Sequence, residues 1–205
     1  MPGARDLLSR LLADEDPIDT RVLIVAAHPG DEVIGIGGQL PRLRNVSVLH
    51  VTDGAPRDGR DAGRAGFARF EDYAAARRQE VEKALALAGL DAGQTACLGI
   101  PDQEAARDLV RITEAVAATI REMRPIVVVT HAYEGGHPDH DAVAFAVQKA
   151  RRILREAGEA APAVAEMSGY HAGEDRIEIG CFLPHDDVQP VSVPLSAAAR
   201  ALKQR

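Results

Sequence analysis

The sequence has few of the features that would direct a chain to nucleic acid or to a membrane. It contains no Trp and only 3% aromatic residues, and its formal net charge is −7. It therefore has neither the basic surface nor the stacking side chains that nucleic-acid binding uses. No apolar run approaches the roughly 20 residues of a membrane-spanning helix, and the N-terminus lacks the uninterrupted apolar region of a secretory signal. We expect a cytoplasmic protein without a membrane span.

Cysteine is also scarce. Cys97 and Cys181 are the only two, too few for a disulfide framework and without the spacing of a C-x-x-C metal site, so we expect two buried thiols. The 205 residues are 46% hydrophobic and 27% charged, with no polar linker, repeat or low-complexity segment. This predicts one domain over residues 1–205. Because residues 195–205 form a helical pattern that has barely begun, a truncated C-terminus is one interpretation.

Apolar runs and helical patterns alternate along the chain. The pattern predicts strands at 21–27, 45–53, 95–100 and 125–131, helices at 5–13, 33–40, 70–88, 103–123, 140–157 and 195–205, a loop at 54–66, and edge strands or loops at 163–170, 176–183 and 187–194. Strands that alternate with helices form right-handed crossovers and a parallel sheet. We therefore predict an α/β fold with a Rossmann-like, doubly wound, mostly parallel sheet in the order 3-2-1-4-5.

Histidines and carboxylates gather after two of these strands. They lie in "HPGDE" and in "THAYEGGHPDHDAV", and comprise His28, Asp31, Glu32, His131, His137, Asp139, His140 and Asp141. The strands before them are neighbours in the predicted order, and ligands bind at the carboxyl ends of such neighbours. Two imidazoles and a carboxylate that converge from loops can hold zinc with one position open. Our choice of ligands is His28, Asp31 and His140.

An open zinc site predicts hydrolysis of an amide or ester. The ion lowers the pKa of bound water to roughly 7 and polarises a carbonyl group; another divalent metal is an alternative. A carboxylate must take the proton of the water, and a protonated group must meet the oxyanion or the leaving amine. His137 is a candidate for the second role, with Asp139 or a neighbour orienting its ring. His131 either belongs to this site or simply ends its strand.

"AHPGDE" followed by "HPDH" resembles the PIG-L/LmbE family of zinc-dependent de-N-acetylases, whose patterns are AHPDDE and HPDH or HxDH. "RRQEVEKALALAGL" and "LGIPDQE" are similar to two further family segments, so the resemblance covers roughly residues 20 to 150. It implies a Rossmann-like fold, removal of an N-acyl group from an amino-sugar conjugate, and zinc on His28, Asp31 and His140. It also implies that His137 is the protonated partner and Asp139 its orienter.

The resemblance further implies that the helix arginine, here Arg77, contacts the substrate. We also expect Asp53, at the end of a predicted strand, and Asp102, in "LGIPDQE", to lie at the substrate site, although Asp53 could instead cap its own turn. The expected partner is a small N-acylated molecule, and the oligomeric state stays open. A nucleotide-binding oxidoreductase or methyltransferase is disfavoured, because "HPGDEVIGIGG" crowds carboxylates where a G-x-G-x-x-G loop should bind phosphate.

Gly30 departs from the family pattern. The family has an aspartate there, the general base, and loss of a general base typically lowers the rate by about 10²- to 10⁴-fold. Three hypotheses follow: another base acts, the protein binds its ligand without efficient turnover, or the glycine inactivates the enzyme. The candidates for another base are Asp102, Glu134, Asp53 and Glu32. The alternative function is therefore a catalytically inactive, metal-bound ligand-binding protein.

Overall fold

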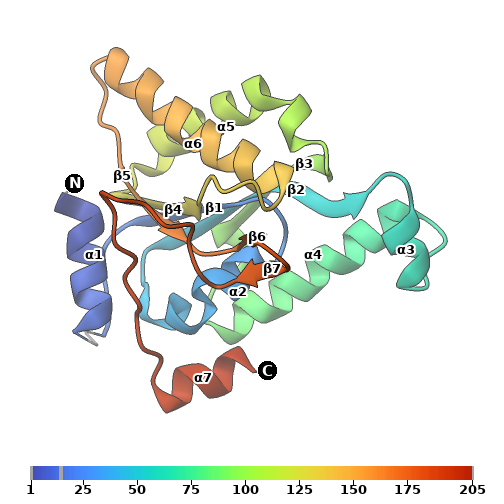
Figure 1. The fold of residues 1–205 in the computed structure, drawn as a ribbon, viewed down its shortest axis with the longest axis horizontal. Helices are drawn as coiled ribbons and strands as arrows, with labels where there is room; N and C mark the ends of the chain where they lie inside the picture. Colours follow the sequence, from blue (N-terminus) through green and yellow to red (C-terminus); the bar gives the residue numbers. More distant parts are fainter. Residues whose placement is uncertain (1, 14–15, 205) are drawn as a thin grey trace.

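The computed structural model describes residues 2–13 and 16–204. At its centre is a five-stranded sheet in the order β3-β2-β1-β4-β5, with every pair parallel (Figure 1). The strands are β1 Val22–Ala26, β2 Val46–Pro56, β3 Thr95–Asp102, β4 Val127–His131 and β5 Ala163–Met167. The predicted α/β class and the strand order are confirmed. β1 and β4 lie side by side at the centre, so the residues that follow them meet at one edge of the sheet.

Helices cover both faces of the sheet. They are α1 Pro2–Leu12, α2 Asp31–Ile36, η1 Gly37–Arg42 (a 3-10 helix) and α4 Phe70–Leu87 on one face, and α5 Leu109–Met123 and α6 Pro138–Glu156 on the other (Figure 1). β1 is buried along its whole length because successive side chains enter opposite cores. Ile24 packs with the first group of helices, whereas Val25 packs with the second.

The predicted helix over 103–123 begins later than its sequence pattern indicates. Only a 3-10 turn, η3 Ala105–Arg107, precedes α5 at Leu109. The buried carboxylate of Asp139 accepts the backbone N–H groups of Gln103, at 2.6 Å, and Ala105, at 3.0 Å. Gln103 is also in the left-handed region, with φ 69°. These long-range bonds replace the first turn of a helix with a fixed loop.

Two other predicted boundaries are wrong. The expected loop 54–66 contains the end of β2 and a short helix, α3 Arg60–Arg64. The expected helix 33–40 begins earlier, at Asp31, and continues after Ile36 as η1, which contains Pro41. A 3-10 helix makes fewer and differently spaced hydrogen bonds than an α-helix, so it tolerates this proline.

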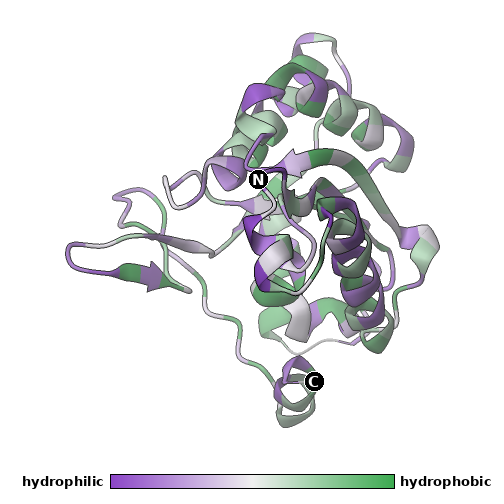
Figure 2. Ribbon diagram, turned by 90° about the vertical axis from the view of Figure 1, so that its right-hand side faces the viewer, coloured by the Kyte–Doolittle hydropathy of each residue, from purple (hydrophilic) through white to green (hydrophobic). Residues whose placement is uncertain are grey.

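The segment after β5 has little regular structure. β6 Tyr170–Ala172 and β7 Ile177–Ile179 form an antiparallel hairpin, while the predicted segment 187–194 has no strand. α7 Ala197–Lys203 lies against η1. Figure 2 shows the hairpin projecting away from the helical layers. Within the described ranges, no helix is both long and apolar enough to cross a membrane.

The prediction of two buried thiols is wrong. Cys97 and Cys181 are both exposed. Cys97 lies on β3, which is an edge strand and is covered less completely than the central strands. Cys181 follows β7, outside the two cores that flank the sheet.

Candidate metal centre

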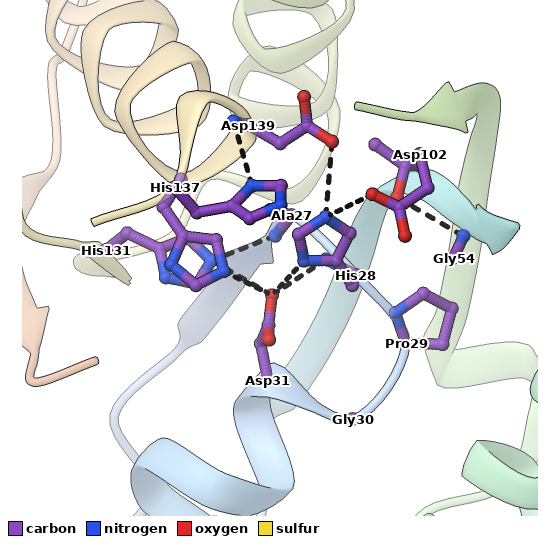
Figure 3. Close-up of polar contacts among 12 residues, drawn as sticks. Ala27, His28, Pro29, Gly30, Asp31, Gly54, Asp102, His131, His137 and Asp139 are labelled. Carbon is purple, nitrogen blue, oxygen red and sulfur yellow. Dashed lines mark hydrogen bonds and ion pairs between the residues drawn. The ribbon is translucent and has the colours of Figure 1, made fainter. Parts of the chain in front are cut away.

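The two predicted His/Asp groups meet at the carboxyl edge of the sheet (Figure 3). His28 follows β1, and Asp31 begins α2 directly after the turn at Pro29 and Gly30. From the neighbouring strand, His131 ends β4, and His140 lies in the first turn of α6. The parallel β1–β4 pairing therefore brings together residues that are more than a hundred positions apart.

One oxygen of Asp31 forms the centre of the cluster. Its Oδ2 lies 3.2 Å from His28 Nδ1, 3.3 Å from His131 Nε2 and 3.4 Å from His140 Nε2. Two ligands about 2.0–2.1 Å from a tetrahedral zinc ion lie about 3.3–3.4 Å apart, so each of these distances from Asp31 suits a pair of ligands on such an ion. Asp31 and the two histidines from β4 and α6 form one of the groups that could hold a metal ion.

His131 differs from the other two histidines in how its nitrogen is used. Its Nε2 accepts the backbone N–H of Ala27 at 2.9 Å, which occupies the lone pair a metal would need. Burial lowers the pKa of His131, which favours the neutral ring. The ring stacks on His140 with centroids 4.0 Å apart and an interplanar angle of 12°. His131 therefore supports the ring of His140. Asp31 Oδ2 also accepts a backbone N–H, that of His28 at 2.8 Å, but a carboxylate has further lone pairs that a metal can use.

The other nitrogen of His28 points away from Asp31 toward two carboxylates. Its Nε2 lies 3.0 Å from Asp102 Oδ1 and 3.2 Å from Asp139 Oδ2 (Figure 3). Burial alone would lower the pKa of His28, but its bonds to Asp102, Asp139 and Asp31 outweigh burial and raise it to about 12. A carboxylate behind a ligand histidine fixes the orientation of the ring, as in many metal sites.

His137 caps the N-terminus of α6, and its ring faces the cluster. Its Nδ1 accepts the backbone N–H of Asp139 at 3.1 Å, so the neutral ring carries its proton on Nε2. The ring meets His28 edge-on, with centroids 4.7 Å apart. Burial and the positive charge of His28 lower the pKa of His137. Asp139 thus orients this ring through its backbone, while its carboxylate binds His28 and the loop before α5.

The three expected substrate residues occupy different environments. Asp102 lies within the cluster, beside His28. Arg77, on α4, donates from Nη2 to the carbonyl of Pro29 at 2.7 Å and thereby holds the turn between the ligands. Asp53 accepts Arg57 Nη2 at 2.6 Å and the N–H of Ala55 at 3.0 Å, so it caps its own turn. The structure brings Asp102 to the metal ligands, but not Asp53.

Gly30 adopts a conformation that suits glycine. Its φ is 106° and its ψ is −14°, outside the regions that L-residues occupy readily. Among the described residues, no heavy atom lies within 4 Å of a Cβ built at this position. The N–H of Gly30 donates to Glu32 Oε2 at 3.2 Å, and the same oxygen lies 3.0 Å from His50 Nε2.

His50 is a residue that sequence reasoning did not single out. Both it and Glu32 are buried, with 3% and 0% of their surfaces exposed. The pair lies beneath the turn and holds the backbone of Gly30 in place. The available signal was a histidine inside the otherwise apolar segment "VSVLHV" of β2.

The fold and site define a class of protein: an α/β chain with a His/Asp centre, suited to a divalent metal ion, at the carboxyl edge of a parallel sheet. Residues 23–151 match the family model described as "PIG-L: GlcNAc-PI de-N-acetylase". This chain belongs to that family. The match spans β1 to α6 and so includes every residue of the cluster.

Two bacterial relatives named as deacetylases agree with this family membership. A Bacillus cereus protein, "Probable N-acetyl-alpha-D-glucosaminyl L-malate deacetylase 2", is 30% identical over 137 residues, which are 65% of this chain and 61% of that protein. A Nakamurella multipartita protein, "1D-myo-inositol 2-acetamido-2-deoxy-alpha-D-glucopyranoside deacetylase", is 30% identical over 223 residues, which are 88% and 75% of the two chains. The chain spans about three fifths of the length of the first of these relatives.

Solved structures show the same fold. The A40926 pseudoaglycone deacetylase Dbv21 superimposes with a TM-score of 0.64 and 25% identity, covering 91% of this chain and 79% of that one. The conserved protein TT1542 from Thermus thermophilus has a TM-score of 0.54 and 27% identity, covering 75% and 68%. Both solved structures therefore share the fold of this chain.

Proposed function

We propose that this protein is a zinc-dependent hydrolase that removes an N-acyl group, acetate in the simplest case, from an amino-sugar conjugate. In this reaction water adds across the C–N bond of the amide, giving a carboxylate and a free amine. The observation that carries the proposal is that Asp31 Oδ2 lies 3.2 Å from His28 Nδ1 and 3.4 Å from His140 Nε2, distances that suit pairs of ligands on one zinc ion. The amino sugar comes from the names of the relatives, which are deacetylases of N-acetylglucosaminyl malate and inositol conjugates.

Two imidazoles and one carboxylate are a common ligand set of catalytic zinc, which leaves a position for water or substrate. When bound, the ion supplies a water of lowered pKa and polarises the amide carbonyl. His28 Nδ1 and His140 Nε2, the nitrogens nearest Asp31 Oδ2, would hold the ion together with Asp31. Asp102 and Asp139 hold the ring of His28 from behind.

Proton handling falls to His137 and Asp102. The Nε2–H of the neutral His137 ring would donate a hydrogen bond to the amide oxygen, because its Nδ1 is engaged at the helix N-terminus. The proton that the base takes from water would pass to the leaving nitrogen. Of the four candidates for the base that Gly30 cannot supply, Asp102 is the one that lies within the cluster, where it also pairs with His28 Nε2. Of the other candidates, Asp53 is paired with Arg57, and Glu32 is buried against His50. Glu134 accepts the backbone N–H of Leu183.

Arg77 and Asp53 remain proposed contacts to the sugar. Both are partly exposed near the carboxyl edge of the sheet, with 33% and 19% of their side chains accessible. Each has a polar partner within the protein, so a sugar hydroxyl would share these groups. Binding of the conjugate by hydrogen bonds suits a neutral sugar better than a strongly anionic one, because the chain has a net charge of −7.

A second candidate function is a metal-bound ligand-binding protein without turnover. Gly30 favours it, because the position of the family base has no side chain and the space beside it is open. Both functions require the same metal centre. They differ in whether acetate is released.

The test combines zinc content with acetate release from N-acetylglucosaminyl malate and from methyl N-acetylglucosaminide. We expect about one zinc per chain, lost in His140→Ala and retained in the matched control His185→Ala, whose histidine is exposed outside the cluster. Acetate released by the wild type and not by His140→Ala supports the hydrolase. Zinc bound without release of acetate from either compound favours the binding protein. No zinc in the wild type after zinc is supplied contradicts both functions.

A further inference from the structure

We propose that the outward apolar face of the β6–β7 hairpin binds an apolar aglycone, so that the substrate is an N-acylated amino sugar joined to an alkyl or aryl group. This inference rests on the proposed function and adds the class of conjugate to it. The face consists of Tyr170, Ala172, Ile177 and Ile179. We call it the hairpin platform.

The register of the hairpin puts these four side chains on one face. Tyr170 pairs with Ile179, and Ala172 pairs with Ile177. Residues directly opposite each other in an antiparallel pair point to the same side, and alternate residues along a strand do so too. His171 and its partner Glu178 therefore point to the other side, where His171 is buried.

The hairpin platform is continuous with the metal centre. The ring of Tyr170 lies against the proposed ligand His140, with centroids 5.3 Å apart. The backbone also makes close contact at this point, because a Cβ built on Gly136 would clash with the carbonyl of Tyr170. Gly136 precedes His137, so the hairpin is packed directly against the loop that holds this residue. Ile179 lies one step farther from the centre, across from Tyr170.

Solvent exposure distinguishes the hairpin platform from core packing. Ile177 is 63% exposed and Ile179 is 75% exposed, and both side chains lie on the same face of β7. Figure 2 shows β7 as a hydrophobic segment of the projecting arm. The other face of the hairpin, where His171 is buried, packs against the protein, whereas these isoleucines face solvent. An exposed apolar face that adjoins a binding site is typical of a surface that contacts a ligand.

The apolar side chains of the hairpin platform determine which kind of aglycone it can bind. All four positions offer carbon surface, and the single polar atom is the hydroxyl of Tyr170. A charged or highly hydroxylated aglycone would gain little on this face, whereas an alkyl or aryl group would lose water-exposed surface on both sides of the contact. The sugar would lie at the metal centre and its apolar aglycone along Tyr170 and Ile179.

The test compares methyl and octyl N-acetylglucosaminide, using both calorimetric affinity for the zinc-loaded protein and acetate release. We expect the octyl compound to bind about tenfold more tightly, because an open face removes only part of the alkyl surface from water. The preference should disappear in the double variant Ile177→Ser, Ile179→Ser. It should persist in Val110→Ser, a matched control on α5 whose side chain is similarly exposed, at 73%.

The two measurements separate this inference from the proposed function. Acetate released equally from both glycosides, with equal affinities, would leave the hydrolase standing and overturn the hairpin platform. Tighter binding of the octyl compound without any release of acetate would support the platform and contradict the hydrolase. Sedimentation gives a further check. A dimer that the double variant converts to monomer, with an unchanged octyl preference, would assign this face to a second copy of the chain and refute the proposal.

Discussion

Replacing Gly30 with aspartate tests whether the missing carboxylate limits turnover. The substitution restores the family's general base one residue before Asp31. No described atom lies within 4 Å of the new Cβ, so the side chain has room. If the rest of the site is competent, we expect kcat/KM for deacetylation to rise by about 10²-fold or more, the usual contribution of a positioned base.

The same substitution should destabilise the fold. A φ of 106° lies beyond the left-handed region that aspartate tolerates, and such a conformation costs about 1–3 kcal/mol. Gly30→Ala has the same backbone strain and no carboxylate, so it is the matched control. We expect both variants to unfold at lower urea concentration than the wild type, and only Gly30→Asp to gain activity.

The assay is acetate release at fixed zinc loading, combined with urea unfolding of each variant. An unchanged rate in Gly30→Asp, with zinc bound and the fold intact, would refute the reasoning that the position of Gly30 limits catalysis. In that event Asp102→Asn distinguishes the two remaining explanations. Loss of the wild-type rate in this variant, with zinc affinity unchanged, would identify Asp102 as the working base. A wild type that releases no acetate would instead favour the ligand-binding protein.

Three further predictions concern the surroundings of the metal ligands. The pKa of His28 is raised to about 12, so the metal-free ring is protonated at neutral pH, and zinc must displace a proton from Nδ1. Calorimetry in buffers of different ionisation enthalpy should therefore detect proton release, and zinc affinity should rise with pH between 6 and 8; an affinity independent of pH would contradict this role of His28. Arg77→Ala should weaken zinc binding and lower kcat about tenfold, because the turn loses its bond to Pro29, while the exposed control Arg78→Ala should not. A raised KM with normal zinc affinity would instead mean that Arg77 mainly contacts substrate. Asp139→Asn should lower zinc affinity about 10- to 100-fold and reduce the free energy of unfolding, since its buried carboxylate joins His28 to the loop before α5; wild-type values of both would show that this carboxylate is dispensable.

Local sequence determined the main elements of this protein and which side chains meet at one edge of its sheet. The continuous apolar runs before His28 and His131 could only be central strands, and alternation with helices implied the parallel order that makes them neighbours. His28, Asp31 and His140 follow from that order, because the carboxyl ends of adjacent parallel strands meet at one edge. Hydrophobic periodicity and chain connectivity are sufficient for these conclusions.

Tertiary structure decided what each polar side chain faces. The carboxylate of Asp139 turns to His28 and to the N–H groups of the loop before α5, which delays the start of that helix. Arg77 binds the carbonyl of Pro29, and Glu32 pairs with His50 beneath the same turn. These contacts join residues that are distant in the chain, and buried polar groups take whichever partners the packed strands and helices bring within reach. Spacing along the sequence holds no information about that choice, so only the folded arrangement of the sheet and its helices determines it.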